Sequence, residues 1–165
     1  MNINVEIIRN HPGWKSHKLL NKRLMKKIIA NILNRYKNFR KIENFEISIL
    51  LTDNNQMLNL NSQFCNKEKV TNVLSFPDKE IDFRHLLEFT SDLDYMYLGD
   101  VAFGYEIIQS EAISHNKSFE NHFSHLLVHS ILHLLGFNHQ HDEEANIMEN
   151  LEIDILKDFA IASPY

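Results

Sequence analysis

The stretch HSILHLLGFNH, residues 129–139, carries the strongest structural signal in this sequence of 165 residues. Its histidines stand at i, i+4 and i+10, and Gly136 lies between the second and the third. On an α-helix, His129 and His133 lie one turn apart on one face, so both imidazoles can reach a single ion. His139 cannot join them from a continuous helix, because it would lie about 15 Å from His129 along the axis. We therefore predict that the helix ends at Gly136 and that the chain reverses there.

The three histidines predict a metal centre, and we expect His129, His133 and His139 to bind one Zn²⁺ per chain. Three neutral imidazoles leave a tetrahedral zinc ion one open position for water, which is the arrangement of a catalytic site. The sequence assigns no catalytic group beyond this metal-bound water. The alternatives are a helix with solvated histidines, a site in which His141 replaces His139, and another metal that suits imidazole, such as nickel, copper or iron.

Two further histidines, His122 and His125, share a ridge with His129 and His133, within an arc of about 80° on the helix predicted for residues 119–135. We interpret both as neighbours of the metal ligands or as surface residues rather than as ligands. The residues that point away from this ridge, toward a predicted core, are Phe123, Leu127, Ser130, Ile131 and Leu134.

Upstream of the histidine motif, the apolar residues follow two different periods. Alternation predicts strands, and it is clearest in NFEISILLT. The predicted strands cover residues 3–9, 44–52, 71–76 and 98–103, with Pro77 stopping the third. We predict a turn at His11-Pro12-Gly13 and a loop over residues 78–97, with a helical turn at 83–89.

Helical spacing predicts an amphipathic basic helix over residues 16–37 and further helices toward the end of the chain. The further helices are a short one capped by Asp53 and running to about Phe64, then 105–115, 119–135 and 143–158, with Asp142 as the N-cap of the last. Strands first and helices later predict an α+β fold, a small sheet of about four strands packed with about five helices. The length predicts one domain, residues 1–165.

Composition points to the cytoplasm. The single cysteine, Cys65, allows no intrachain disulfide, which suits a reducing compartment. The first residues, MNINVEIIRN, lack the basic and apolar regions of a signal peptide. No apolar run approaches the roughly 18 residues of a membrane span, so we expect no membrane partner.

The charge is unevenly distributed, although its sum is only −5. Residues 1–41 have a balance of +10 and residues 42–165 a balance of −15. A basic face of this kind can attract phosphates, and the alternative is a helix face that is merely solvated. The candidates for contacting an RNA backbone are Lys22, Arg23, Lys26, Lys27 and Arg35.

The residue after the first histidine argues against peptide hydrolysis. Zinc peptidases with this spacing carry glutamate there to move a proton, and this chain has Ser130. Phosphodiester cleavage depends less on such a carboxylate, because the metal and basic side chains can share the developing charge. The missing glutamate and the basic helix therefore both favour phosphate esters.

Four sequence blocks carry a resemblance: LNLNSQF (58–64), KVTNVLSFP (69–77), LGDVAF (98–103) and HSILHLLGFNHQHDEEANIMENLE (129–152). In these blocks and in their order along the chain, the sequence resembles the YbeY family of bacterial rRNA maturation factors. The resemblance implies a small mixed sheet with helices, zinc on the three histidines, and a metal-dependent endoribonuclease specific for single strands. It also implies maturation of the 3′ end of small-subunit rRNA, ribosome quality control, and the small ribosomal subunit as partner. Met148 matches a family methionine near the metal, although its spacing fits a core residue equally well.

Two positions depart from the family pattern. Asn138 stands where the family usually has aspartate, and Cys65 stands where it has an arginine that lines the cleft. Lys67 and Lys69 are the candidates for replacing that arginine as point charges, and we include both among the predicted RNA-binding residues. The departure leaves a second hypothesis, a non-catalytic ribosome-assembly factor with a structural or vestigial metal site. A zinc peptidase-like hydrolase is the third, and Ser130 argues against it.

Overall fold

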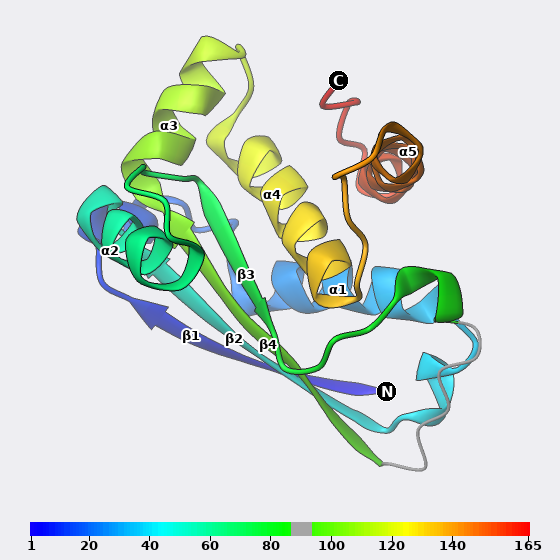
Figure 1. Cartoon of the computed structure of the whole chain (residues 1–165). Helices are drawn as coiled ribbons and strands as arrows, with labels where there is room; N and C mark the ends of the chain where they lie inside the picture. Colours follow the sequence, from blue (N-terminus) through cyan, green and yellow to red (C-terminus); the bar gives the residue numbers. More distant parts are fainter. Residues whose placement is uncertain (87–93) are drawn as a thin grey trace.

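A four-stranded mixed sheet forms the centre of the computed structural model, which describes residues 1–86 and 94–165. The strand order is β1-β2-β4-β3 (Figure 1). The first three strands in this order run parallel, and β3 pairs antiparallel with β4 at one edge. Their bounds are β1 Asn2–Arg9, β2 Asn44–Thr52, β3 Val73–Pro77 and β4 Tyr95–Gly104.

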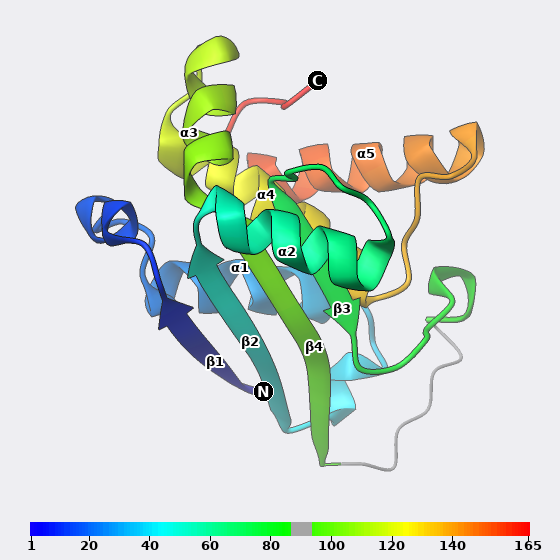
Figure 2. The ribbon, with the colours of Figure 1, turned by 60° about the vertical axis from the view of Figure 1, so that its left-hand side comes forward.

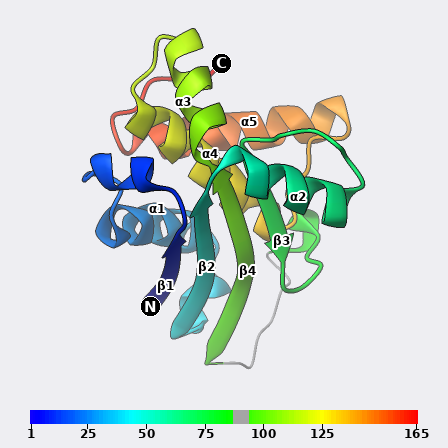
Figure 3. The same ribbon diagram turned by 90° about the vertical axis from the view of Figure 1, so that its left-hand side faces the viewer.

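Within the described residues, five α-helices pack around the sheet: α1 Lys22–Asn34, α2 Asn54–Cys65, α3 Tyr105–Ser114, α4 Phe119–Leu134 and α5 Asp142–Lys157. Figure 2 shows α2 in front of one face of the sheet, with α1 and α4 behind the other. α5 packs against α4 on the side away from the sheet (Figure 1), and α3 follows the end of β4 (Figure 3). None of the helices that the structure describes is long and apolar enough to cross a membrane.

The main core lies between the sheet and the layer of α1 and α4. In β2, alternate side chains are buried, from Phe45 to Leu51, and their neighbours are half-exposed. On the helix side, Phe123 of α4 is fully buried and packs against Phe103 of β4, with ring centroids 4.7 Å apart. The indole of Trp14 closes the cluster 5.6 Å from Phe123. The apolar face of α4 is therefore fixed on the sheet, and its opposite side is left for other chemistry.

A β-bulge at Gly99 changes which side chains of β4 face this core. The register between β2 and β4 shifts between Glu46 and Ser48, where β4 contains one residue more than β2. Gly99 has φ +133°, and a Cβ there would collide with the carbonyl oxygen of Phe76. The extra residue lets both Leu98 and Val101 face the core, which simple alternation would forbid.

The predicted α+β fold and the existence of each main element are confirmed. β2 has the predicted bounds, and Asp53 caps α2 by accepting a hydrogen bond from the backbone N–H of Gln56 at 2.8 Å. The residues that we expected to point from α4 into the core are all buried. They are Phe123, Leu127, Ser130, Ile131 and Leu134.

The first helix was predicted too long, as residues 16–37. α1 begins at Lys22, because the side chain of Asn21 accepts from the backbone N–H of Leu24, and it ends at Asn34. The residues before it form a 3-10 helix, Pro12–Ser16, where we predicted only a turn. Leu20 and Tyr36 extended the helical period in the sequence, but they pack on the core from outside the helix.

Four other features also differ from the prediction. β3 includes Pro77, which an edge strand tolerates, and β4 begins at Tyr95, inside the loop predicted over residues 78–97. The predicted helical turn at 83–89 is a 3-10 helix at Phe83–His85, and residues 87–89 lie outside the described residues. Asp142 is the first residue of α5 rather than its cap, a position that His141 holds without a side-chain bond.

Replacing Phe123 by alanine should lower the free energy of unfolding by about 3–5 kcal/mol, because it leaves a cavity between α4 and β4. Phe64→Ala is the matched control, since Phe64 on α2 is 59% exposed, and we expect it to cost less than about 1 kcal/mol. Urea denaturation followed by circular dichroism measures both. Equal losses would show that the core does not lie where the structure places it.

Candidate metal centre

The histidine motif lies on the side of α4 that faces away from the sheet core. His129 and His133 are half-buried there, whereas Ser130 between them is fully buried. The Ser130 hydroxyl donates to the carbonyl of Leu127 at 2.8 Å, within its own helix. The helix therefore presents two imidazoles one turn apart, as the spacing predicted, and points the residue between them elsewhere.

Gly136 ends α4 and reverses the chain. It has φ +86°, which favours glycine, and an added Cβ would collide with the carbonyl oxygen of Ile81. Its N–H donates to the carbonyl of His133, and the N–H of Phe137 donates to that of Leu132, both at 3.0 Å. These two bonds form a Schellman motif, the helix end that the glycine predicted.

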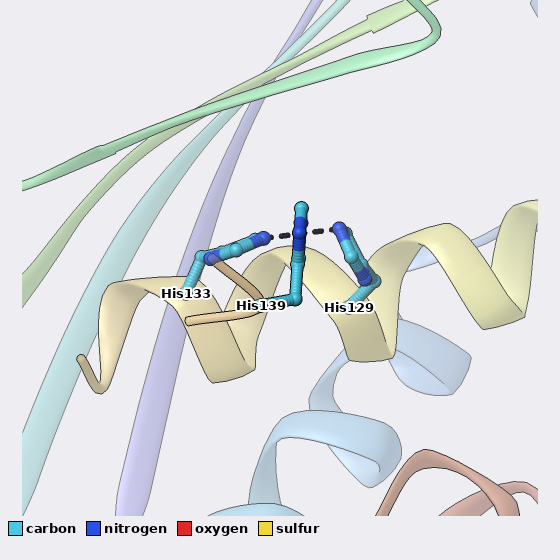
Figure 4. Close-up of side chains that lie close together, drawn as sticks. All are labelled: His129, His133 and His139. Carbon is cyan, nitrogen blue, oxygen red and sulfur yellow. Dashed lines mark hydrogen bonds between the residues drawn. The ribbon is translucent and has the colours of Figure 1, made fainter. Parts of the chain in front are cut away.

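After this reversal, His139 lies beside the two helix histidines (Figure 4). One nitrogen of each ring of His129, His133 and His139 lies within 4.8 Å of the others. The ring centroids of His139 are 5.5 Å from His129 and 5.0 Å from His133. His141, the alternative third ligand, is exposed and does not belong to this group. The structure thus brings together the three residues that we predicted as ligands.

Hydrogen bonds determine which nitrogen of each helix histidine carries the proton. Nδ1 of His133 lies 2.9 Å from the carbonyl oxygen of Phe137, and Nδ1 of His129 lies 2.7 Å from Oε1 of Glu152. A carbonyl and a carboxylate only accept, so both Nδ1 atoms must donate. In the neutral rings, both Nε2 atoms then carry lone pairs, and they face each other at 3.0 Å.

Between two neutral rings, this pairing suits a metal ion and not a hydrogen bond. A hydrogen bond across the contact dashed in Figure 4 requires a second proton on one ring. Burial, reinforced by nearby His129, lowers the pKa of His133 to about 4, so this ring is neutral at neutral pH. Two nitrogens on tetrahedral zinc, each at about 2.0–2.1 Å, lie about 3.3 Å apart, close to the observed separation. The residues present therefore fit zinc.

Glu152 of α5 contacts this site, and the sequence analysis did not single it out. Its side chain is 0% exposed, and it also accepts from Nε2 of His125 at 2.9 Å and from the hydroxyl of Tyr165 at 2.5 Å. Burial alone would raise the pKa of Glu152, but the hydrogen bonds from the two histidines outweigh it and lower the pKa to about 2. The available signal was an acidic residue within the apolar stripe of α5.

The other histidines and Met148 also have defined places. His122 is buried and contacts Glu111 at 2.8 Å, and His125 contacts Glu152, so neither joins the three-histidine group. Met148 is buried and lines a small cavity of about 220 Å³ together with His129 and His139. It is therefore a core residue and a neighbour of the predicted ligands at once.

A cleft of about 1300 Å³ opens beside the histidines. It is bounded by the end of α2 with the loop after it, by β3 with its flanking residues, and by the turn after α4. The charged and polar residues among those that line it include Cys65, Lys67, Lys69, Lys79, Glu80, Asp82, Arg84, Glu144 and the three histidines. The cleft is thus bordered by charges of both signs.

The structure divides the predicted RNA-binding residues into two groups. Lys67 and Lys69 line the cleft, on a loop that buried Asn61 anchors with hydrogen bonds to both of their backbones. The other group belongs to α1 and the residue after it and does not line the cleft, and its Arg35 pairs with Asp158 at 2.8 Å. This group is Lys22, Arg23, Lys26, Lys27 and Arg35. RNA binding by either group stays a prediction.

The two departures from the family pattern both lie at this site. Cys65 is exposed on the wall of the cleft. Asn138 uses its side-chain oxygen to accept from the backbone N–H of His139 at 2.7 Å, a bond that aspartate would also make. The asparagine therefore keeps the local geometry of the third histidine without the charge.

Comparisons with known proteins agree with the site. The model of a family described as "Endoribonuclease YbeY" matches residues 13–160. The chain belongs to the YbeY family. A relative from Francisella tularensis subsp. tularensis, named "Endoribonuclease YbeY", is 32% identical over 164 residues, which are 99% of this chain and 90% of the relative. Membership in the YbeY family supports a hydrolase of the nuclease class.

A solved structure shares the fold. The solution structure of TM1509 from Thermotoga maritima aligns with a TM-score of 0.54, covering 94% of this chain and 91% of that one. The two sequences are 19% identical, so this likeness concerns the fold alone. It agrees with the mixed sheet that the resemblance to the YbeY family implied.

Replacing Gly136 by alanine should lower the free energy of unfolding by about 2 kcal/mol or more, because of the left-handed backbone and the collision with Ile81. It should also weaken zinc binding, because His139 follows the distorted turn. Gly104→Ala is the control, since Gly104 has φ −94° and the nearest atoms to its added Cβ belong to the side chains of Met57 and Ile107 rather than to the backbone. Urea denaturation and zinc titration measure the two effects, and a stable Gly136→Ala variant with normal affinity would contradict this account of the turn.

Proposed function

We propose that this chain is a zinc-dependent endoribonuclease that cuts single-stranded rRNA. The observation that carries the proposal is the pair of Nε2 lone pairs of His129 and His133 facing each other at 3.0 Å, with His139 beside them, at the edge of a large cleft. The family model described as "Endoribonuclease YbeY" supports the reaction class. The donor set of three imidazoles supports zinc.

In this proposal, His129, His133 and His139 hold one zinc ion. When bound, the ion supplies Lewis-acid stabilisation of a phosphoryl oxygen and an activated water nucleophile. The basic residues of the cleft hold the phosphate backbone, with Lys67 and Lys69 in place of the missing arginine at position 65. Arg84 is a further candidate for binding a phosphate. Asp82 orients its guanidinium by accepting hydrogen bonds of 2.9 Å from Nε and from one terminal nitrogen.

We further propose maturation of the 3′ end of small-subunit rRNA and ribosome quality control as the biological role. The partners would be rRNA and the small ribosomal subunit, and the location the cytoplasm. The resemblance of the histidine block and of KVTNVLSFP to the YbeY family supports this role. The basic balance of residues 1–41 supports contacts with RNA beyond the cleft.

A peptidase role is disfavoured by Ser130. Zinc peptidases need a carboxylate at this position to carry a proton to the leaving amine. Ser130 is fully buried and its hydroxyl donates to Leu127, so it cannot reach a substrate. The competing function with a specific observation behind it is a non-catalytic assembly factor, because exposed Cys65 replaces an arginine in the cleft.

Replacing His133 by alanine should remove the bound zinc and reduce cleavage of a defined single-stranded RNA by more than about 100-fold, since loss of even an outer contact to a zinc ligand costs 10–100-fold. His141→Ala is the matched control and should retain both properties. Elemental analysis and a cleavage assay before and after chelation measure them. Cleavage that survives both the His133 variant and the chelator would refute the zinc-dependent mechanism. Zinc binding without any turnover would favour the assembly factor.

The double replacement of Lys67 and Lys69 by alanine should weaken RNA binding and its salt dependence. Each lost phosphate contact lowers the slope of log affinity against log salt by about 0.7 for a single strand, so we expect a change of about 1.4. The matched control replaces Lys22 and Lys26 of α1 by alanine. With a short oligonucleotide that fits the cleft, this control should bind with the salt dependence of the wild type and cleave at the same rate. The opposite result would place the substrate on α1 rather than in the cleft.

A further inference from the structure

The buried carboxylate of Glu152 joins three separate parts of the chain. It lies on α5, and it receives hydrogen bonds from α4 and from the segment after α5. Oε1 accepts from Nδ1 of His129 at 2.7 Å. Oε2 accepts from Nε2 of His125 at 2.9 Å and from the hydroxyl of Tyr165 at 2.5 Å. Both oxygens are therefore occupied, and only the first points at a predicted ligand.

Packing between α4 and α5 does not by itself explain why a carboxylate is buried here. Burying a charge is unfavourable, and apolar side chains of similar size often join two helices at least as well as a buried ionic group does. Its neighbours on α5 include buried Met148, Ile155 and Leu156, so an apolar residue would suit the position. An apolar residue, however, could not accept the hydrogen bond from Nδ1 of His129.

The two helix histidines are oriented by different means. A backbone carbonyl, that of Phe137, receives the Nδ1 proton of His133. A side chain, Glu152, receives that of His129. A bond of this second kind keeps the proton on Nδ1, leaves the lone pair on Nε2, and raises the basicity of the ring.

We propose that Glu152 is a positioning residue for the metal centre, and that Tyr165 and His125 hold its carboxylate in the orientation that His129 needs. The inference rests on the proposed function, because it assumes that His129 binds the metal. Tyr165 lies far along the chain from His129, yet its hydroxyl reaches the carboxylate and its ring centroid lies 5.7 Å from that of His125. The segment after α5 thereby takes part in organising the site.

Zinc affinity of the purified protein, measured by competition with a chromophoric chelator, tests the proposal without RNA. Glu152→Gln and Glu152→Met should each lower the affinity by about 10–100-fold, as expected for the partner of a zinc ligand. Tyr165→Phe, which removes one hydroxyl, should give a smaller loss in the same direction. Asp154→Asn is the control, since Asp154 is exposed on the same helix.

Thermal unfolding separates positioning from structural support. Glu152→Met restores an apolar contact, so a positioning role predicts a melting temperature near or above that of the wild type together with weaker zinc binding. A purely structural role predicts a lower melting temperature and, in the folded fraction, unchanged affinity. Normal zinc affinity in folded Glu152→Met and Glu152→Gln would overturn the proposal.

A spectroscopic measurement on the wild type keeps the proposal falsifiable even if both variants fail to fold. Imidazole ¹⁵N spectra of the metal-free protein in mildly alkaline buffer should show His129 mainly with its proton on Nδ1. Tyr165→Phe should shift part of the population toward the other tautomer. A wild-type His129 protonated mainly on Nε2 would refute the role of Glu152. If the protein bound zinc as expected but did not cleave RNA, the proposed function would be contradicted, whereas the positioning role of Glu152 would not.

Discussion

Two nitrogen lone pairs held face to face are the constraint on which the candidate site depends. Nε2 of His129 and Nε2 of His133 lie 3.0 Å apart. In each ring, the proton sits on the other nitrogen, Nδ1, which donates it to a carboxylate or a carbonyl oxygen. Neutral rings in this arrangement repel each other, and a cation between them replaces the repulsion by coordination. A bound cation would therefore stabilise this arrangement of the two rings.

Each part of the fold contributes one condition for this geometry. The apolar face of α4, buried on the sheet through residues such as Phe123, fixes the positions of the two helix histidines. The Schellman turn supplies both the acceptor for His133 and the path that brings back His139. α5 supplies Glu152 from the other side. The small sheet serves as a rigid base, and the chemistry is assembled on the helix layer above it.

Local patterns could be predicted from the sequence, and contacts between distant residues could not. The alternation in β2 and the glycine at 136 depend on neighbours in the chain, so both predictions agree with the structure. The period that suggested a helix over residues 16–37 was misleading, because Leu20 reaches the core from the preceding turn. Glu152 was missed because its partners lie 23 and 27 residues earlier and 13 residues later, where no local rule connects them.

The turn at Gly136 also limits the shape of the cleft. The carbonyl oxygen of Ile81 occupies the place where any other residue at position 136 would carry its Cβ. Ile81 and Gly136 both line the cleft, and they contact each other there main chain against main chain, without a side chain between them. A rotamer change at position 136 therefore cannot move the two segments apart. The border of the cleft next to the histidines is thus built from backbone, and only a movement of the backbone would change it.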